Sequence, residues 1–517
     1  MGLVTQITKP AVGGVSPVTT STYETVAPTG KNPFFRLNRV VEKIDATRTT
    51  ATTIAYGADY TPATTTLDAD GLKVKTVTTY DTEGRLTSSQ SDGAPKITYA
   101  YDKRDNVTST NASLLGADET IGYDRNSREV SRGVPVTGGA MVTCKRYNAM
   151  GNVVRAWGPS KTTGVAVCPA EAAPVPMTDT AYDDHHRPNR VTQYLSAAEG
   201  GNRVTETTYY ANDRVNSVRK AVGTGLAQTY ATYVYNPNGT VAITTDARGS
   251  ATVNLYDGHD RLYRTHYPLE GAPGMGDANN YEEYGWDANG NMVALRKRDG
   301  QTVTQTFDEL NRLSSRTYPG NAGNVQYSYD LRGLKTASQY GDGSHTITNS
   351  YDGLGQLTQT SAAGRLLRYS YDTAGRVTDV AWPDGFHVGV QYDAFSRPSQ
   401  LLENGTVSLA KYSYDTLGRR VQVDLGNGTR TEFAYDNQGF LSGKNHRFTS
   451  SAEDWIATFT RNQKGDITKQ GVTNSRYGWT PVVATSAYTV NALNQYVTVS
   501  GSAVKHDLNG NLTGDGV

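Results

Sequence analysis

The chain has 517 residues and 50 acidic and 50 basic side chains, so its formal net charge is zero. A chain without net charge has no long-range field that would recruit nucleic acid or an anionic membrane. No apolar run in the sequence approaches the roughly 20 residues of a membrane helix. Composition therefore predicts neither a nucleic-acid partner nor a membrane span.

Low hydrophobicity alone would also be compatible with disorder, since only 36% of the residues are hydrophobic and 53 are Gly. Disorder, however, favours high net charge and few aromatic residues. This chain is neutral and contains 34 Tyr, against only 9 Phe. We expect a folded sheet with one or both faces wet, rather than a disordered chain or a dense core.

The dipeptide Tyr-Asp occurs eleven times in the sequence. From Asp287 to Asp436 the copies, including two in which Trp or Phe replaces Tyr, follow one another at intervals of 20 to 22 residues. A fixed period of this size indicates stacked structural repeats. The eleven copies begin at Tyr80, Tyr101, Tyr123, Tyr182, Tyr256, Tyr329, Tyr351, Tyr371, Tyr392, Tyr414 and Tyr435.

Taken in chain order, the copies divide the sequence into two parts. Residues 1–75 hold only degenerate versions, at 34–40 and 67–74, whereas residues 76–517 hold the regular array. Looser copies fill the gaps in that array: Tyr147-Asn148, Tyr235-Asn236, Trp286-Asp287, Phe307-Asp308, His506-Asp507 and the degenerate stretches 461–467 and 490–496. We therefore predict one tandem array over nearly the whole chain.

Each copy has the pattern of a β-hairpin turn. Gly usually stands three residues after the Asp, where it tolerates a positive φ, and Asp at the first turn position caps backbone amides. Before the turn, stretches such as 96–101 alternate by two and use strand-forming residues. Helix periodicity is weak throughout, so the predicted class is all-β: tandem hairpins in a long antiparallel sheet.

Arg often follows the turn, where it can face the Asp of its own hairpin or of the neighbouring one and so fix the register. We expect the Tyr rings to stack on one another from repeat to repeat. The turn residues assigned from the pattern are Tyr80, Asp81, Gly84, Arg85, Tyr351, Asp352, Gly355, Tyr371, Asp372, Gly375, Arg376, Tyr414, Asp415, Gly418, Arg419, Tyr435, Asp436 and Gly439.

Cys144 and Cys168 are the only cysteines. Two Cys cannot form a zinc site alone, and their spacing matches no redox motif. They flank the hairpin at Tyr147 and the Pro-containing stretch 158–176 follows. The sequence leaves two alternatives open, a disulfide that staples this longer loop or two buried thiols; a disulfide would indicate an oxidising compartment.

Motifs that could carry chemistry have simpler interpretations as turns. The Asp68–Gly71 stretch lacks the spacing and terminal Glu of a calcium loop, and His185-His186 falls on an ordinary hairpin phrase. Asn-Gly-Thr at Asn238, Asn404 and Asn427 is better explained as a hairpin turn than as a glycosylation site. Without a nucleophile elbow, metalloprotease motif or phosphate-binding loop, we expect no catalytic, cofactor or metal site.

The phrase Tyr371-Asp372-Thr373-Ala374-Gly375-Arg376-Val377-Thr378 resembles the YD repeat of the bacterial Rhs family. That family includes insecticidal-toxin C subunits, wall-associated contact-inhibition proteins and animal teneurins. The resemblance extends over about residues 34–513. It implies that the repeats form a β-strip that spirals into a hollow shell, which in toxin members encloses a C-terminal effector.

The chain departs from the full family pattern, because the closing region of complete members carries an Asp-Pro core motif and no Asp-Pro dipeptide occurs here. We therefore expect an array truncated before closure, without autoproteolytic residues and without the effector itself.

From these features we expect a non-catalytic shell segment that encapsulates and helps to deliver an effector, with a secretion-system component as a further partner. We expect the protein to be secreted or at the cell surface, although Met1 to Gly14 has no apolar signal core. The alternative is an adhesion or glycan-binding module, in which Trp side chains stack on sugars: Trp157, Trp286, Trp382, Trp455 and Trp479.

Overall fold

The computed structural model describes residues 3–11, 14–27, 33–58, 60–92, 94, 96–111, 118–136, 138–163, 166–172, 175–321, 323–393, 395–415, 417–478 and 487–515. Over these ranges the chain forms strands β1 to β44, and its helices are three short 3-10 turns at Ala197–Glu199, Pro319–Asn321 and Ser451–Glu453. The predicted all-β class is confirmed.

A single sheet contains strands β1 to β39. Each strand in it pairs antiparallel with the next one in the chain, as β6 with β7 and β30 with β31. Its first strands are β1 (Gln6–Thr8), β2 (Val18–Val26), β3 (Phe34–Lys43), β4 (Thr49–Tyr56), β5 (Pro62–Leu67), β6 (Val74–Tyr80), β7 (Leu86–Ser91), β8 (Ile97–Tyr101), β9 (Val107–Asn111), β10 (Glu119–Tyr123), β11 (Glu129–Val136), β12 (Gly139–Tyr147) and β13 (Val153–Thr162).

The middle strands continue the same order without a crossover. They are β14 (Met177–Tyr182), β15 (Pro188–Tyr194), β16 (Arg203–Tyr209), β17 (Val215–Lys220), β18 (Gln228–Tyr235), β19 (Val241–Asp246), β20 (Ala251–Tyr256), β21 (Leu262–Leu269), β22 (Ala272–Trp286), β23 (Met292–Arg296), β24 (Thr302–Phe307), β25 (Leu313–Thr317) and β26 (Val325–Tyr329).

The last strands of the sheet lead to two small separate sheets, one of β40 to β42 and one of β43 and β44. These strands are β27 (Lys335–Tyr340), β28 (Ile347–Tyr351), β29 (Leu357–Ala362), β30 (Arg365–Tyr371), β31 (Val377–Ala381), β32 (His387–Tyr392), β33 (Pro398–Glu403), β34 (Val407–Tyr414), β35 (Arg420–Leu425), β36 (Arg430–Tyr435), β37 (Leu441–Arg447), β38 (Trp455–Arg461), β39 (Ile467–Val472), β40 (Tyr488–Val490), β41 (Tyr496–Val499), β42 (Ser502–Ala503), β43 (Lys505–His506) and β44 (Leu512–Gly514).

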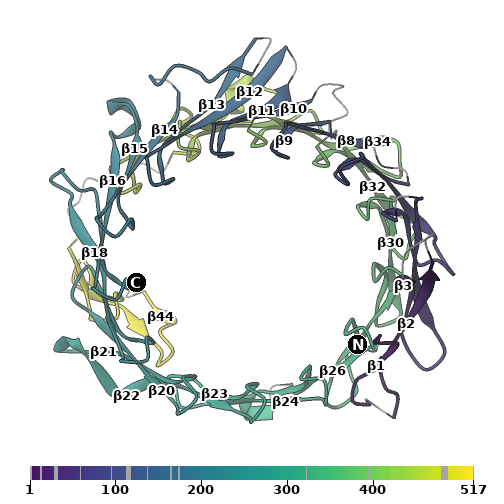
Figure 1. The fold of residues 1–517 in the computed structure, drawn as a ribbon. Coiled ribbons are helices and arrows are strands. Elements are labelled where there is room, and N and C mark those ends of the chain that lie inside the picture. Colours follow the sequence, from purple (N-terminus) through teal and green to yellow (C-terminus); the bar gives the residue numbers. More distant parts are fainter. Residues whose placement is uncertain are drawn as a thin grey trace.

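The sheet curls into a ring around an open centre and then overlaps itself (Figure 1). In that view β30, β32 and β34 project onto the arc of the ring that holds β2, β3 and β8, although these strands are far apart in the chain. A hydrogen bond of 2.9 Å from the Leu331 amide to the Ile44 carbonyl joins the overlapping layers. We call residues 44–301 the first winding and residues 330–510 the second winding.

Because neighbouring hairpins turn at opposite edges of an antiparallel strip, all Tyr-Asp turns lie at one edge. The intervening turns, such as 195–202 and 382–386, lie at the other edge, which we call the opposite edge. The sheet is continuous across residue 75, the end of the first part of the chain in the sequence analysis. Residue 75 lies in β6, which pairs with β5 on one side and with β7 on the other.

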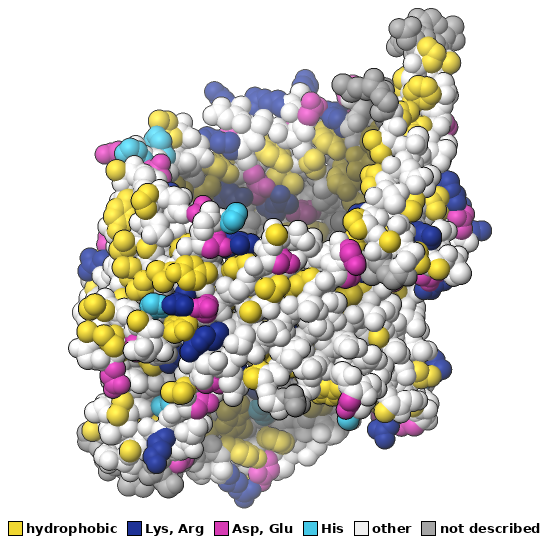
Figure 2. All heavy atoms as spheres, turned by 90° about the horizontal axis from the view of Figure 1, so that it is seen from below, with side chains coloured by type: hydrophobic (Ala, Val, Ile, Leu, Met, Phe, Trp, Pro, Cys, Tyr) yellow, Lys and Arg dark blue, Asp and Glu magenta, His cyan; other side chains and the backbone are white. Residues whose placement is uncertain are grey.

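The wall is one sheet thick, so most of its side chains are half-buried. The hydrophobic cluster that is fully buried consists of Ala140, Val142, Cys144 and Trp157, under the loop that follows β13. On the face shown in Figure 2, acidic, basic and hydrophobic side chains are interspersed, without a large field of one charge. Such a surface is what the neutral composition predicts.

None of the helices in the described ranges is long and apolar enough to cross a membrane.

Candidate functional site: the seam between the two windings

The Tyr-Asp turn is the unit from which the wall is built. In the copy at Asp81, the Gly84 amide donates to the Asp81 carbonyl at 3.0 Å and the Asp81 amide donates to the Arg85 carbonyl at 2.9 Å. The Asp81 carboxylate accepts from the amides of Glu83 and Arg85 at 3.1 and 2.8 Å. Gly84 has φ of 80°, in the left-handed region. A bulge follows, since Tyr80 pairs with Leu86 after a register shift.

The other turns assigned from the sequence have the same geometry. Their Gly residues have φ between 77° and 86°: Gly355, Gly375, Gly418 and Gly439. Non-Gly residues at the same position are also left-handed, with φ between 58° and 64°: Asp105, Ser127, His186, Asp260, Asn311 and Ser396. The carboxylates of Asp352, Asp372, Asp415 and Asp436 each accept two backbone amides of their own turn.

Each turn Arg pairs with the Asp of its own hairpin and also reaches the next hairpin. Arg376 Nε lies 2.7 Å from Asp372 Oδ2, and its Nη1 lies 3.0 Å from Ser396 Oγ of the next turn. Hydrogen bonding from Arg128 to Asp124 lowers the pKa of that carboxyl, although burial opposes the shift. The Asp124 carboxylate therefore stays ionised at neutral pH, as the structural ion-pair partner of Arg128.

The predicted stacking of Tyr on Tyr is wrong. Where the preceding hairpin carries Arg after its turn, the aromatic ring of the next repeat lies under that guanidinium: Arg376 is 4.6 Å from the Tyr392 ring and Arg397 is 4.3 Å from the Tyr414 ring. The Tyr392 hydroxyl donates to the Val377 carbonyl at 2.7 Å. Arg and Tyr alternate along the edge because the aromatic face attracts the cation while the hydroxyl satisfies a backbone group.

Two further copies of the turn have no Tyr-Asp dipeptide and were missed in the sequence. At Tyr56 the Gly57 amide donates to the Thr61 carbonyl, and at Tyr209 the Tyr210 amide donates to the Arg214 carbonyl. The Tyr209 copy ends on Arg214, which is the signal that could have found it. Conversely, the predicted degenerate copies at 34–40 and 67–74 lie in strand β3 and in a turn of the opposite edge.

The seam is the line along which Tyr-Asp turns of the second winding meet the opposite edge of the first winding. It is mostly polar. Its hydrogen bonds join Glu199 to Asn437, Gln438 to the carbonyls of Met177 and Tyr194, Lys464 to Gln228, Asn494 to Asp246, and Asn509 to Asp299. The partners are 210 to 261 residues apart in the chain.

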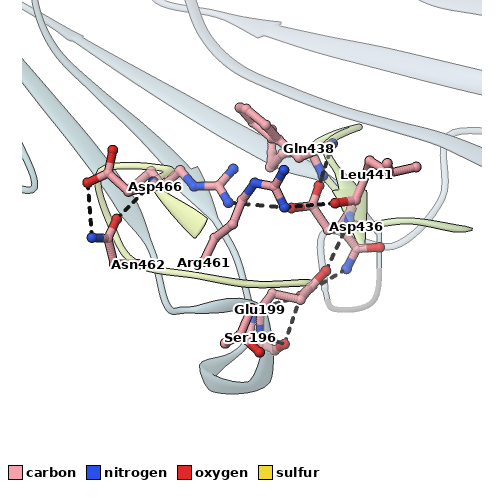
Figure 3. Close-up of polar contacts among 12 residues, drawn as sticks. Ser196, Glu199, Asp436, Gln438, Leu441, Arg461, Asn462 and Asp466 are labelled. Atoms are coloured by element: carbon pink, nitrogen blue, oxygen red, sulfur yellow. Dashed lines mark hydrogen bonds and ion pairs between the residues drawn. The ribbon is translucent and has the colours of Figure 1, made fainter. Parts of the chain in front are cut away.

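Asp436 shows how a repeat turn becomes a seam contact (Figure 3). Phe440 stands where half of the clearer repeats carry Arg, so Asp436 has no Arg at the end of its own turn. Arg203 of the first winding takes that place, with Nη2 at 3.4 Å from Asp436 Oδ2. Its guanidinium also lies 4.3 Å from the centre of the Phe440 ring. Both side chains of the pair are only 7% exposed.

Glu199 holds the loop that supports Arg203. Its carboxylate accepts from the Ser196 amide at 3.0 Å and from the Asn437 amide of the second winding at 3.0 Å, so it caps one turn in each winding. Burial opposes its ionisation, but these hydrogen bonds keep the pKa of Glu199 below its ordinary value. Gly200 meets the Arg461 carbonyl so closely that a side chain there would collide with it.

Cys144 and Cys168 form a disulfide with a Cα–Cα distance of 5.9 Å. The bond fixes the loop after β13 over the buried cluster, where Trp157 Nε1 donates to the Pro169 carbonyl at 2.8 Å. Glu171 of the same loop pairs with Arg155 at 2.7 Å. The loop lies beside the seam, since a hollow of about 340 Å³ is lined by Cys144 and Trp157 on one side and by Asn437 and Gly439 on the other.

The Trp residues singled out for sugar stacking differ in exposure. Trp157 is buried, and Trp286 and Trp455 are half-buried. Trp382 is 37% exposed, and Trp479 lies outside the described residues. Among the described residues, no group of three or more His, Cys, Asp or Glu side chains is arranged to hold a metal ion.

Known proteins share this fold and parts of the sequence. The teneurin YD-shell family model matches residues 272–380. Over 122 residues the chain is 30% identical to the tRNA3(Ser)-specific nuclease WapA of Bacillus spizizenii, a match that covers 23% of this chain and 5% of that protein. The chain therefore spans a small fraction of this relative.

Solved structures of Tc toxins are similar over almost the entire chain. The Photorhabdus luminescens Tc holotoxin pore gives a TM-score of 0.50 at 13% identity, covering 98% of this chain and 28% of that chain. The TcdB2-TccC3 crystal structure gives a TM-score of 0.49 at 13% identity, covering 98% and 29% of the two chains. At such low identity the likeness shows the fold alone. The tandem Tyr-Asp hairpins, the single curled sheet and the teneurin YD-shell match over residues 272–380 together show that the chain is similar to Rhs/YD-repeat proteins.

Proposed function

We propose that the chain is a non-catalytic wall segment of a toxin shell that encloses an effector polypeptide and keeps it from its surroundings until delivery. The observation that carries the proposal is the closed ring: one sheet curls around an open centre and is joined to itself along the seam (Figure 1). A repeat protein that only needed a binding surface could remain an open solenoid.

The wall has the composition that a container requires. A single sheet with two half-wet faces needs little dry core, and its hairpin turns satisfy the backbone groups at their own edge. Strands β40 to β44 carry the seam contacts of Asn494 and Asn509, and β44 projects inside the ring in Figure 1. An effector polypeptide joined after β44 would therefore start inside the enclosure.

The charged side chains support a structural role. In the turns, Arg pairs with Asp, and at Asp183 hydrogen bonding from Arg187 lowers the pKa of the carboxyl. A general acid or base would need a pKa close to the working pH. The disulfide between Cys144 and Cys168 favours an oxidising final compartment, in agreement with secretion or display at the cell surface.

Protease protection of a cargo tests this proposal. The chain is extended after its last residue with an unstructured reporter peptide, purified, and treated with a protease that leaves the folded wall intact. The seam-weakened variant carries Asn494→Asp and Asn509→Asp, which set carboxylates against Asp246 and Asp299. The control is Asn289→Asp in the turn at Trp286-Asp287, where Asn289 donates to Asn311 of the neighbouring turn in the same winding.

We expect the reporter to be protected in the parent chain and in the control, and digested in the seam-weakened variant. Rapid digestion of the reporter in the intact parent chain would contradict the proposal, as would a cryo-EM map of a straight solenoid without a lumen.

A further inference from the structure

Along β11 to β13 the seam opens into a hollow of about 780 Å³ between the two windings. The first winding contributes Val134, Met141 and Lys161, which pair directly across neighbouring strands and therefore lie on one face of the sheet. The second winding contributes Phe395 and Leu417 from two successive Tyr-Asp turns. Unlike the hydrogen-bonded parts of the seam, this stretch is lined largely by apolar side chains.

The two side chains of the second winding are unusual for their place in the repeat. Phe395 and Leu417 occupy the third turn position, counted from the Asp, where other copies carry polar residues such as Glu83, Asn126 and Asn289. Phe395 is 41% exposed and Leu417 is 40% exposed. Large apolar side chains that stay exposed side by side, opposite an apolar strip, mark a surface that a ligand can cover.

One charge on the lining of the hollow is not neutralised. Three of its four charged residues have ion-pair partners of their own: Arg132, Arg397 and Asp415. The fourth, Lys161, forms no hydrogen bond or ion pair within the described part of the chain. Its ammonium lies beside the turn between β11 and β12, since a Cβ on Gly138 would come 3.5 Å from Lys161 Nζ. The hollow therefore combines an apolar lining with one free cation.

We infer that this hollow binds a free long-chain fatty acid, with the alkyl chain along the seam and the carboxylate on Lys161. Covering the apolar lining removes it from water, and the carboxylate gains a charge-assisted hydrogen bond from the ammonium. An extended chain has room, because the hollow continues into the smaller one beside the disulfide; both are lined by Thr143, Pro159 and Leu417. A mostly apolar pocket with few polar groups is typical of small-ligand sites.

A polypeptide segment fits the hollow less well than an alkyl chain. Strand β12 is already paired with β11 on one side and with β13 on the other, so its backbone groups are not free to bind a further strand. The backbone of a buried peptide would leave its own amides and carbonyls without partners, which is costly. An alkyl chain has no hydrogen bonds to satisfy.

The test is displacement of a dansyl-labelled fatty acid from the full chain by dodecanoate, tetradecanoate and hexadecanoate, each below its critical micelle concentration. Affinity should rise roughly tenfold for every two CH₂ groups that enter the hollow. Lys161→Gln should weaken binding severalfold and remove the preference for the acid over its methyl ester, whereas Lys161→Arg should retain both. Leu417→Asn should weaken binding about tenfold, and the turn tolerates it because Asn126 occupies the equivalent position.

The matched controls are Met150→Asn and Lys103→Gln, which should leave binding unchanged. Met150 is 67% exposed at the same turn position as Leu417, Lys103 is exposed in another turn, and neither lines the hollow. Circular dichroism checks that every variant remains folded. Failure of the folded parent chain to bind any of the fatty acids would overturn the proposal, as would binding that Lys161→Gln and Leu417→Asn both leave unchanged.

Two further measurements separate the fatty acid from other occupants. Flotation with vesicles of phosphatidylcholine and phosphatidylserine should leave the chain unbound. Co-flotation that Leu417→Asn abolishes, without displacement of the probe by free fatty acids, would overturn the proposal and show a lipid surface as the partner. Displacement of the probe by an apolar peptide but by none of the fatty acids would overturn it in favour of a polypeptide.

Discussion

Arg203 and Asp436 lie on different windings, 233 residues apart in the chain, and form a buried ion pair across the seam. The pair is incompletely satisfied, because Nε and Nη1 of Arg203 are buried without a hydrogen-bond partner among the described residues. A buried ion pair with unpaired guanidinium nitrogens contributes more to fixing the register of two surfaces than to the free energy that holds them together. We infer that it selects which turn of the second winding sits on β16.

Asp436→Asn should destabilise the protein by about 3 kcal/mol, because it leaves the Arg203 charge buried without a counter-ion. Asn still caps the turn, as Asn148 does in its own repeat. The matched control is Asp257→Asn, which removes a half-buried pair with Arg261 that remains in contact with solvent and should cost less. Urea unfolding followed by circular dichroism measures both variants, and equal losses would contradict a special role of the seam pair.

Tyr392 provides a test of the ladder in which Arg and Tyr alternate. Tyr392→Phe removes the hydroxyl that donates to Val377 and should cost about 1 kcal/mol. Tyr392→Leu also removes the ring that lies 4.6 Å from the Arg376 guanidinium, so it should cost more. Thermal melts of the two variants compare these contributions. If both variants have the same melting temperature, the cation–π contact has no measurable effect on stability.

Gly375→Val should destabilise its hairpin by about 1–3 kcal/mol, because the position has φ of 78° and a β-branched residue is strained there. The new Cβ would also come 3.2 Å from Gln356 Nε2. Gly258→Val is the control, since Gly258 is in an equivalent turn without a positive φ and has open space around it. Differential scanning calorimetry should show a loss for the first variant only.

Acid should loosen the Tyr-Asp turns over a defined pH range. Hydrogen bonding from Arg261 lowers the pKa of Asp257 from its ordinary value of 3.8 to about 2. A carboxyl whose pKa is lower in the folded state stabilises the fold fully above pH 4, and this contribution disappears as the pH falls towards 2. Melting temperatures measured from pH 6 to pH 2 should therefore fall below pH 4. In Arg261→Gln the fall in melting temperature below pH 4 should be smaller than in the parent chain. An unchanged pH profile would contradict the role assigned to Arg261.

Reduction of the Cys144–Cys168 disulfide should destabilise the region around β12 and β13 by about 3 kcal/mol, as expected for a loop closed over 24 residues. Trp157 should become more exposed, because its hydrogen bond to Pro169 depends on the stapled loop. Tryptophan fluorescence and limited proteolysis between residues 163 and 176 report this change. The Cys144→Ser/Cys168→Ser variant should show the same state without reductant, and its insensitivity to reductant is the control.

The local chemistry of the repeat could be derived from the sequence. Within five residues, Asp81 caps two amides and Gly84 accepts the left-handed conformation, so the Tyr-Asp phrase predicts a hairpin wherever it occurs. Asp105 and His186 follow the same rule in place of Gly. The all-β class follows from these turns and from the alternation between them.

Only the tertiary structure decided which turns meet another winding. The curvature of the ring accumulates over many strands, so Asp436 reaches Arg203 and Asn494 reaches Asp246 through small rotations that no short sequence pattern records. For the same reason, stacking of Tyr on Tyr was a wrong expectation, since twist and bulge place Arg376 over Tyr392. The hairpin is encoded by hydrogen bonds between near neighbours. The shape of the ring depends on the summed twist and curvature of all the hairpins.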